Sequence, residues 1–353
     1  MNDKQECIQT DAVIIGAGPV GLFQVFELGL LDLKAELIDS LPQVGGQCSE
    51  LYPEKPIYDI PAYPRIGAQE LVDQLEKQIE PFNAGRHLNQ QVTGFEQKDD
   101  GRFRVLTSKG KVFDAGAVII AAGLGAFQPR ALRAKNLPEQ SPVNLHYKVT
   151  RRDRFKGKRL VILGGGDSAL DWTLDLAELA DSITLVHRRH DYRAQPASVQ
   201  KMLKLVEAGK VRQAQGTVSE AFSQPSDDGT RLEALDITDL ERNRHRIEGD
   251  EFLLFWGLAP SLGPIADWSL DIERKQIQVD TEKFQTSIPG VFAVGDINTY
   301  PGKKKLILSG FHEAALAAFA VQKHLNPDAR QFLQYTTTSP IMHERLGVET
   351  PAK

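Results

Sequence analysis

Cysteine is the rarest residue in this chain, with only Cys7 and Cys48 among 353 residues. Two cysteines cannot build the disulfide framework of a small secreted protein, so we expect a reducing, cytoplasmic location. The chain contains neither a Cys-x-x-Cys motif nor two cysteines five positions apart, the two spacings of redox-active pairs. A dithiol relay is therefore excluded, because a single thiol cannot form an internal disulfide.

Long apolar runs are also missing. No segment approaches the roughly 18 apolar residues that a membrane-spanning helix requires. Residues 1–11 are polar and acidic, without the basic end and apolar stretch of a secretory signal. The formal net charge of -5 argues against general nucleic-acid binding. We therefore expect a globular protein that binds neither membrane nor nucleic acid, and we predict no metal site.

Glycine, in contrast, is abundant, with 29 residues. Residues 16–21 (GAGPVG) follow a short apolar run at 12–15, and residues 164–169 (GGGDSA) follow another at 159–163. A glycine-rich turn between a strand and a helix lets the backbone approach phosphate closely, and the helix N-terminus favours anions. Two such turns predict two dinucleotide sites on one chain, most simply one for a flavin and one for a nicotinamide.

The residues that follow the two turns differ in charge. After the first turn, a strand at residues 35–38 ends at Asp39, which is placed to accept a hydrogen bond from a ribose hydroxyl. After the second turn, the next strand leads into Arg188, Arg189 and Arg193. Guanidinium groups bind a phosphate with two parallel hydrogen bonds, so this cluster favours NADPH over NADH.

A further acidic residue, Asp296, follows an apolar strand at residues 291–294. Ligands of open α/β sheets gather at the carboxyl ends of parallel strands. Asp296 is therefore predicted to hold the ribityl chain of a flavin. The long helix predicted at residues 306–324 would direct its positive end at the flavin pyrimidine and stabilise an anionic reduced form.

The order of these segments predicts an α/β protein of two Rossmann-like, three-layer ββα domains, one inserted into the other. Residues 1–122 and 285–353 are assigned to the FAD-binding domain, and residues 123–284 to the NADPH-binding domain. An irregular, proline-containing stretch at residues 125–156 indicates the crossover between them. Residues 332–353 show little periodicity and are predicted to be an irregular tail.

Further motifs accompany the first glycine turn, namely VGGQ at 44–47, YPEK at 52–55, GGGDSALDW at 164–172, HRR at 187–189 and VGD at 294–296. Together they resemble one family, the thioredoxin-reductase-like ferredoxin–NADP⁺ reductases. The resemblance covers nearly the whole chain, and YPEK and GGGDSALDW are its most specific parts. It implies a flavoprotein with FAD in the first domain, NADPH in the second, and a homodimer.

The glycine turns and the resemblance together define candidate site residues. Those predicted to bind FAD are Gly16, Gly18, Pro19, Gly21, Asp39, Gln47, Tyr52, Val92, Asp296 and Thr337. Those predicted to bind NADPH are Gly164, Gly166, Asp167, Ser168, Ala169, His187, Arg188, Arg189 and Arg193.

Hydride transfer to flavin N5 requires no obvious protein acid or base, so no catalytic residue is assigned with certainty. Tyr52, Tyr335 and Thr337 are the candidates for contacts at the reacting ring. By the resemblance, Tyr52 lies against one face of the isoalloxazine. A ring of the tail, either Tyr335 or His343, covers the other face.

The predicted function is electron transfer between NADPH and ferredoxin or flavodoxin by a FAD-dependent oxidoreductase. NADPH gives a hydride to flavin N5, and a flavin can release the two electrons singly. One alternative is an NADPH-dependent reductase of a low-molecular-weight disulfide that acts through Cys48, and another is a non-catalytic flavin- or nucleotide-binding regulator. Since ferredoxins and flavodoxins are acidic, a basic docking surface is expected at residues 148–158 or 303–305.

Overall fold

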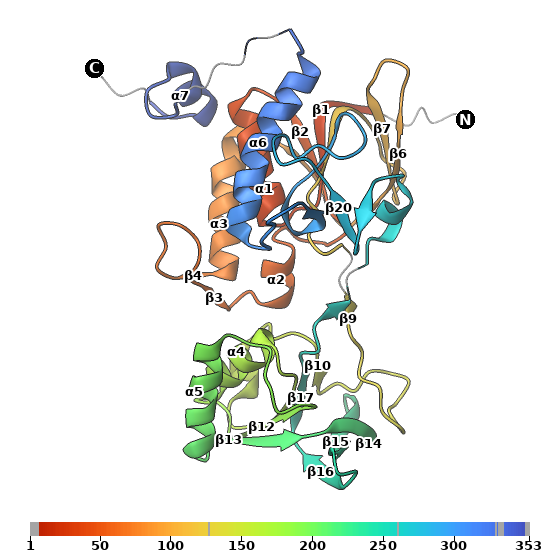
Figure 1. Ribbon diagram of the computed structural model, residues 1–353, viewed down its shortest axis with the longest axis vertical. Coiled ribbons are helices and arrows are strands. Elements are labelled where there is room, and N and C mark those ends of the chain that lie inside the picture. Colours follow the sequence, from red (N-terminus) through yellow and green to blue (C-terminus); the bar gives the residue numbers. More distant parts are fainter. Residues whose placement is uncertain (1–6, 126–127, 260, 329, 331–334, 350–353) are drawn as a thin grey trace. The chain divides into compact units, whose positions relative to one another are not determined.

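The chain divides into two compact units, seen in a computed structural model that describes residues 7–125, 128–259, 261–328, 330 and 335–349. The outer unit comprises Met1–Ala126 and Pro260–Lys353, and the inserted unit comprises Phe127–Ala259. Each unit contains a sheet with parallel strands and its own helices (Figure 1). The predicted fold class, two Rossmann-like units with one inserted into the other, is confirmed.

The outer unit is built on a seven-stranded sheet with the strand order β5-β2-β1-β8-β7-β6, in which β21 also pairs with β8. The pairs among β5, β2, β1, β8 and β21 are parallel, and β6 and β7 are antiparallel additions. The strands are β1 (Cys7–Ile15), β2 (Ala35–Ile38), β5 (Gly85–His87), β6 (Val92–Gln97), β7 (Phe103–Thr107), β8 (Val112–Ile120) and β21 (Val291–Ala293).

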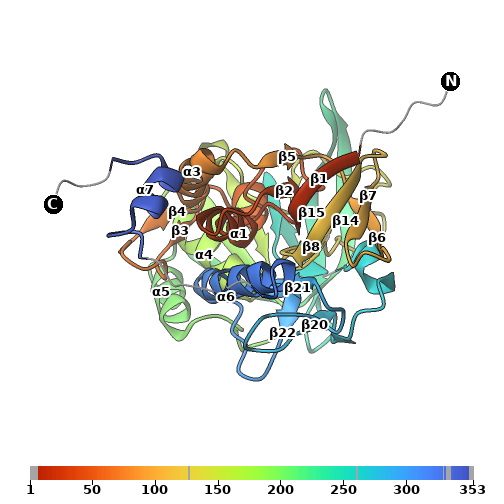
Figure 2. The same cartoon turned by 90° about the horizontal axis from the view of Figure 1, so that it is seen from above.

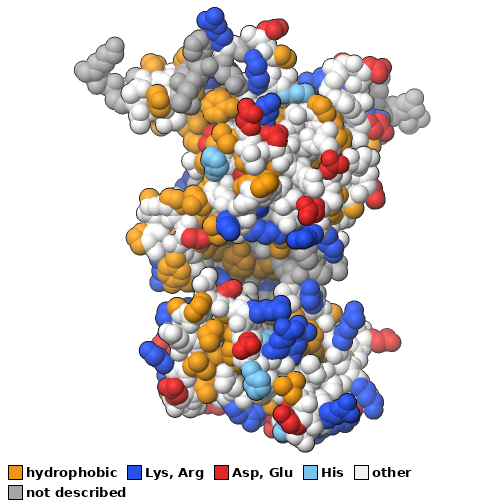
Figure 3. Space-filling view, viewed as in Figure 1, with side chains coloured by type: hydrophobic (Ala, Val, Ile, Leu, Met, Phe, Trp, Pro, Cys, Tyr) orange, Lys and Arg blue, Asp and Glu red, His pale blue; other side chains and the backbone are white. Residues whose placement is uncertain are grey.

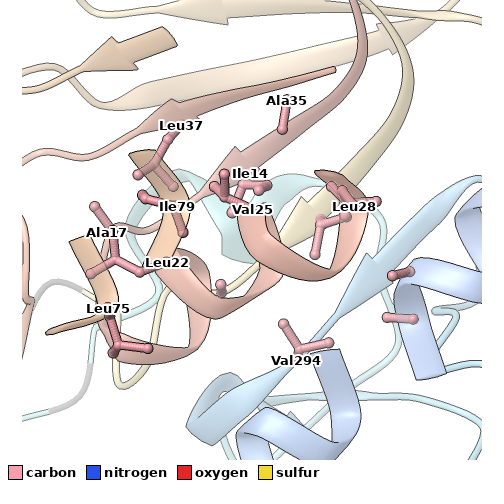
Figure 4. Close-up of a cluster of buried hydrophobic side chains, with 14 of the residues drawn as sticks. Ile14, Ala17, Leu22, Val25, Leu28, Ala35, Leu37, Leu75, Ile79 and Val294 are labelled. Carbon is pink, nitrogen blue, oxygen red and sulfur yellow. The ribbon is translucent and has the colours of Figure 1, made fainter. Parts of the chain in front are cut away.

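The core of the outer unit lies on both faces of β1, because successive side chains of a strand point in opposite directions. On one face, Ile14 packs with Leu22 and Val25 of a helical layer (Figure 4). On the other face, Val13 packs with Phe103. The helical layer consists of α1 (Pro19–Leu30), α3 (Ala68–Ile79) and α6 (Ile307–Leu325), which lie together on one side of the sheet (Figure 2).

Smaller elements complete the outer unit. They are α2 (Gln47–Leu51), β3 (Pro56–Ile57), β4 (Ile66–Gly67), η1 (Glu80–Phe82), η3 (Gly263–Asp267), β19 (Ile272–Glu273), β20 (Gln276–Gln278), η4 (Gly295–Ile297), β22 (Asn298–Thr299) and α7 (Pro340–Leu346). The predicted irregular tail therefore contains a short helix, α7, within residues 335–349, while residues 331–334 and 350–353 lie outside the described part.

Residues 261–284 belong to the outer unit, whereas the sequence had suggested the inserted one. The reason is their packing, because Ile265, Trp268 and Ile277 join the apolar cluster that contains Val13. Nothing in the local periodicity of this stretch indicates which core it enters.

The strand β8 contains a glycine, Gly116, in its interior. This glycine packs closely against a helix. A methyl group at this position would lie 2.3 Å from Cδ2 of Leu325 on α6. The Leu325 side chain would have to shift to admit a methyl group, so the neighbour of this glycine comes from a helix that is far away in the sequence.

The inserted unit has a parallel five-stranded sheet with the order β10-β17-β11-β12-β13 and a separate antiparallel sheet, β14-β15-β16. Its elements are β9 (Gln128–Pro129), β10 (Leu145–His146), η2 (Arg152–Phe155), β11 (Arg159–Leu163), α4 (Asp167–Leu176), β12 (Ser182–His187), α5 (Pro196–Glu207), β13 (Val211–Gln215), β14 (Thr217–Ser226), β15 (Gly229–Thr238), β16 (Arg244–Glu248), β17 (Glu251–Leu254) and β18 (Leu258–Ala259). An apolar cluster that includes Leu163 of β11 and Leu235 of β15 joins the two sheets.

Candidate functional site

The first glycine turn connects β1 to α1 and leaves room at the start of the helix. Gly16 has φ +113°, and a methyl group there would lie 2.4 Å from the carbonyl oxygen of Ala121. A methyl group on Gly21 would lie 1.9 Å from the oxygen of Gly16, so the helix and strand pack too closely for a side chain. A methyl group on Gly18, just before Pro19, would meet no described residue within 4 Å. The open space therefore lies at the N-terminal end of α1, where an anion is favoured.

Asp39 lies directly at this turn. Its Oδ2 accepts a hydrogen bond from the Ala17 amide at 2.6 Å, and its Oδ1 accepts one from the Leu41 amide at 2.8 Å. Burial raises the pKa of this carboxyl group, and the backbone hydrogen bonds oppose the rise. The Ser40 amide also hydrogen-bonds to this carboxylate. The side chain therefore braces the turn, and a carboxylate with about four acceptor positions keeps one for a ligand hydroxyl.

The helix α2 forms a second wall of the same site. The Gly45 amide donates to the Ala17 carbonyl at 2.7 Å, which fixes the loop before α2 against the glycine turn. Nε2 of Gln47 reaches the end of β8, 3.6 Å from where a methyl group on Gly123 would lie. The buried hydroxyl of Ser49 has no hydrogen-bond partner among the described residues. The wall thus presents polar groups at the carboxyl end of the sheet.

Tyr52 and Asp296, which come from opposite ends of the chain, lie close together. Burial raises the pKa of Tyr52, and the neighbouring Cys48 and Asp296 raise it further. The Tyr52 side chain also forms a hydrogen bond with Cys48. Burial raises the pKa of the Cys48 thiol to about 11, and the residue is only 2% exposed. The phenol and the thiol are therefore both neutral at pH 7.

The Asp296 turn adjoins the starts of two helices. Gly295, with φ +79°, packs against Val20 of α1, and a methyl group on Gly310 of α6 would lie 3.4 Å from the Gly295 Cα. Burial raises the pKa of the Asp296 carboxyl group, and the positive charge of Lys303 opposes this. The structure thus brings the turn after β21 together with the N-terminal ends of α1 and α6.

Sequence analysis missed Glu313, a fully buried carboxylate on α6. Its Oε2 accepts from the Gly295 amide at 2.7 Å and from Nδ2 of Asn298 at 2.8 Å. Its Oε1 accepts from the Tyr300 hydroxyl at 2.9 Å and from Nζ of Lys303. An acid within the otherwise apolar stretch of residues 313–321 was the available signal, because charged residues are rarely fully buried without partners.

The prediction that residues 303–305 form an exposed basic patch is wrong for one member. The Lys303 side chain is only 6% exposed, because it pairs with Glu313. Lys304 and Lys305 are exposed.

Three candidates do not join this site. Tyr335 and Thr337 are exposed and precede α7. This helix is attached to the far end of α1, where Arg345 donates to the carbonyl of Leu30 (Figure 1). His343 is a residue of α7, and it is buried, with an exposed fraction of only 5%. The helix α7 therefore lies at the end of α1 opposite the glycine turn of the same chain.

Val92, the remaining FAD candidate, lies at the start of β6. Its side chain is 3% exposed and packs in the apolar cluster with Phe103 and Trp268. Only its backbone can contact a ligand.

The second glycine turn lies in the inserted unit and, like the first turn, contains closely packed glycines. A methyl group on Gly164 would lie 2.6 Å from the Phe255 carbonyl oxygen and 2.8 Å from Cβ of the buried Ala169. Gly166 begins α4 in an extended conformation, and Ser168 in the first turn of the helix is exposed. The start of α4 is therefore accessible to an anion.

The segment after β12 folds back onto this turn. The Arg193 amide donates to the Gly165 carbonyl at 2.7 Å, and the Gln195 amide donates to Oδ1 of Asp167 at 2.8 Å. The His187 ring packs over Gly165, where a methyl group would lie 2.3 Å from it. Asp167 and His187 therefore brace the turn.

Arg188, Arg189 and Arg193 are exposed around the same turn. Burial is the main cause that lowers the pKa of His187, and the positive charges of these three arginines lower it further. The arginines therefore lie near His187. In the part of the chain that the structure describes, no carboxylate pairs with these three guanidinium groups. They are free to bind an anionic ligand.

Cys7 is exposed and Cys48 is buried, and both are free thiols. Over the described ranges, no group of three or more His, Cys, Asp or Glu side chains is arranged to hold a metal ion. Within the same ranges, no helix has the length and apolar character needed to cross a membrane.

The chain is similar to known proteins in sequence and in structure. Residues 10–320 match the family described as pyridine nucleotide-disulphide oxidoreductase. "Ferredoxin–NADP reductase 2" of Cupriavidus metallidurans is 56% identical over 350 residues, which cover 99% of this chain and 94% of that protein. "Ferredoxin–NADP reductase" of Methylibium petroleiphilum is 56% identical over 354 residues, with 99% and 96% covered. The crystal structure of Lactococcus lactis thioredoxin reductase (FR conformation) is similar with a TM-score of 0.75 at 25% identity, covering 90% of this chain and 99% of that one.

Proposed function

The chain belongs to the pyridine nucleotide-disulphide oxidoreductase family and, within it, to the ferredoxin–NADP reductases, and on this premise we propose that it transfers electrons between NADPH and ferredoxin by way of FAD. The observation that carries the proposal is the presence of two dinucleotide-type turns without a cysteine pair. Flavodoxin is an alternative protein partner with the same acidic character.

The outer unit fits FAD. The open space before α1 accommodates a pyrophosphate. Asp39 would bind ribose hydroxyls, and Asp296 would bind the ribityl chain. When bound, FAD supplies the conversion between two-electron hydride transfer and single-electron transfer. Tyr52 and Gln47 would orient the ring, and the buried Tyr52 hydroxyl keeps its proton there.

The inserted unit fits NADPH. The start of α4 would bind its pyrophosphate, and the free guanidinium groups of Arg188, Arg189 and Arg193 would bind the 2′-phosphate. Asp167 and His187 hold the loop that presents these arginines, so we propose a positioning role for them.

The proposal is tested by purification of the chain, an absorbance spectrum, anaerobic titration with NADPH, and a cytochrome c-coupled assay with added ferredoxin. We expect a bound flavin that NADPH bleaches and a cytochrome c reduction rate that depends on ferredoxin. A flavin that stays oxidised in excess NADPH would contradict the proposal and favour a non-catalytic binding protein.

Replacement of Cys48 by alanine is expected to leave ferredoxin-dependent turnover unchanged within about twofold. The thiol is buried and its pKa is raised to about 11, so it is a poor nucleophile at neutral pH. Turnover is measured with ferredoxin and with low-molecular-weight disulfides for the wild type, Cys48→Ala and the exposed-thiol control Cys7→Ala. A disulfide reductase activity that disappears only in Cys48→Ala would establish the alternative function.

Docking of an acidic partner is expected to involve Lys304 and Lys305. Lysine and arginine are scattered among acidic side chains over the face in Figure 3, so the total charge does not single out a surface. These two lysines, in contrast, are exposed just before α6, whose first residues adjoin the Asp296 turn. Complementary charges speed the encounter of proteins, and salt screens them.

The double variant Lys304→Glu/Lys305→Glu is therefore expected to raise the ferredoxin KM about tenfold at low salt, and less at high salt. Lys34→Glu/Lys109→Glu, which reverses two other exposed lysines of the outer unit, is the matched control. Equal KM values for both variants at low salt would place the docking surface elsewhere.

We also propose a homodimer, based on the family resemblance, and a cytoplasmic location, based on the scarcity of cysteine. We keep Tyr335 and Thr337 as proposed flavin contacts, although α7 lies far from the glycine turn of its own chain. Gel filtration checks the dimer directly.

A further inference from the structure

The carboxylate of Glu313 lies at the centre of a buried hydrogen-bond network that the proposed function does not explain. It is 0% exposed, and its oxygens accept from Gly295, Asn298, Tyr300 and Lys303. An ionised carboxylate only accepts hydrogen bonds, so it is the form that satisfies all four donors at once. Such an anion is costly to bury, and the paired ammonium and hydrogen bonds offset that cost.

The network holds the residue before Asp296 from both sides. The Gly295 amide donates to Glu313, and the Gly295 carbonyl accepts from Nζ of Lys303 at 2.9 Å. Asn298, two residues after Asp296, is bound to the same carboxylate. The backbone that carries the Asp296 side chain is therefore fixed on each side by one buried ion pair.

The same carboxylate joins this turn to a helix. Glu313 lies in the second turn of α6, and Gly310 of that helix packs closely on Gly295. The Glu313 side chain thus sets the distance between Asp296 and the N-terminal end of α6. These are the two groups that sequence analysis directs at the flavin.

We propose that Glu313 and Lys303 form a positioning pair that holds Asp296 and the start of α6 in the arrangement that binds the flavin. The inference rests on the proposed function. Both residues are assigned a positioning role, since protein donors occupy both carboxylate oxygens and the ammonium group donates to Glu313 and to the Gly295 carbonyl.

The test compares Glu313→Gln with the double variant Glu313→Gln/Lys303→Met. Apoprotein stability is measured by urea unfolding, and FAD affinity by quenching of flavin fluorescence. Glu313→Gln leaves a buried ammonium group unpaired, so both quantities should fall. The double variant removes both charges, so its stability should recover toward that of the wild type. Its FAD dissociation constant should stay about 10- to 100-fold higher, by analogy with the loss seen when groups that orient metal ligands are removed.

A recovery of FAD affinity together with stability in the double variant would show a merely structural pair and overturn the proposal. The matched control is Glu251→Gln in the inserted unit, where a carboxylate with 6% exposure pairs with His146 and Arg231. It should lower stability and leave FAD affinity unchanged.

Tyr300→Phe keeps the ion pair and removes one donor, so it provides the measurement if Glu313→Gln does not fold. We expect a two- to tenfold rise in its FAD dissociation constant, about the value of one hydrogen bond, and an unchanged constant would count against the proposal. If the wild type itself retains no FAD, the proposed function fails. If the wild type behaves as expected and the variants bind FAD normally, only the positioning role fails.

Discussion

Gly18→Ala is expected to fold like the wild type and to bind FAD at least tenfold more weakly, whereas Gly21→Ala is expected to lose both stability and FAD. A methyl group on Gly21 would lie 1.9 Å from the Gly16 oxygen, a backbone atom that cannot move freely. Such overpacking typically costs about 1–3 kcal/mol, and occasionally more. A methyl group on Gly18 meets no described protein atom within 4 Å and instead enters the space assigned to the pyrophosphate.

The measurements are urea unfolding of the apoprotein and the FAD dissociation constant, for which a tenfold rise equals about 1.4 kcal/mol. The matched control is Gly94→Ala on β6, where a methyl group also has no described neighbour within 4 Å but lies away from the turn. It should change neither quantity by much. FAD binding at wild-type strength in Gly18→Ala would exclude this turn as the pyrophosphate site.

Arg188→Ala/Arg189→Ala is expected to raise the KM for NADPH by about 100-fold and to leave the KM for NADH within about twofold. Both guanidinium groups are exposed beside the second glycine turn, and neither has a carboxylate partner among the described residues. Each hydrogen bond to a charged group contributes about 1.5–3 kcal/mol, roughly tenfold or more. Only NADPH carries the 2′-phosphate that these groups would bind.

Steady-state reduction of ferredoxin with each nucleotide provides the check, and the bound FAD content shows that the outer unit is intact. Arg212→Ala, an exposed arginine on β13 of the same unit, is the control and should have little effect on either KM. An equal loss with NADPH and NADH would mean that the arginines do not distinguish the two nucleotides.

The parallel strands were the most predictable elements. The ranges predicted at residues 35–38 and 159–163 coincide with β2 and β11. Strands buried on both faces form continuous apolar runs with sharp ends, so each is visible within a short window of sequence. The antiparallel strand β14 was missed, since its register is interrupted by irregularities and its residues are only partly buried.

The candidate site was predicted in part. The structure brings together the first glycine turn, Asp39, Gln47, Tyr52 and Asp296, although these residues come from both ends of the chain. It places α7 at the opposite end of α1, and it buries the Val92 side chain in the core. The residues of the sequence motifs could be predicted because each motif specifies its own local backbone geometry.

The sequence alone determined that two strand–turn–helix units carry glycines and that the charge after each turn differs, acidic at Asp39 and basic at Arg188 and Arg189. These features are local, because close backbone approach and charge depend on the residue itself. Only the tertiary structure decided that Lys303 is buried against Glu313 and that Gly116 serves packing against α6. Burial and pairing arise from segments distant in the chain, and a short stretch of sequence contains no record of its eventual neighbours.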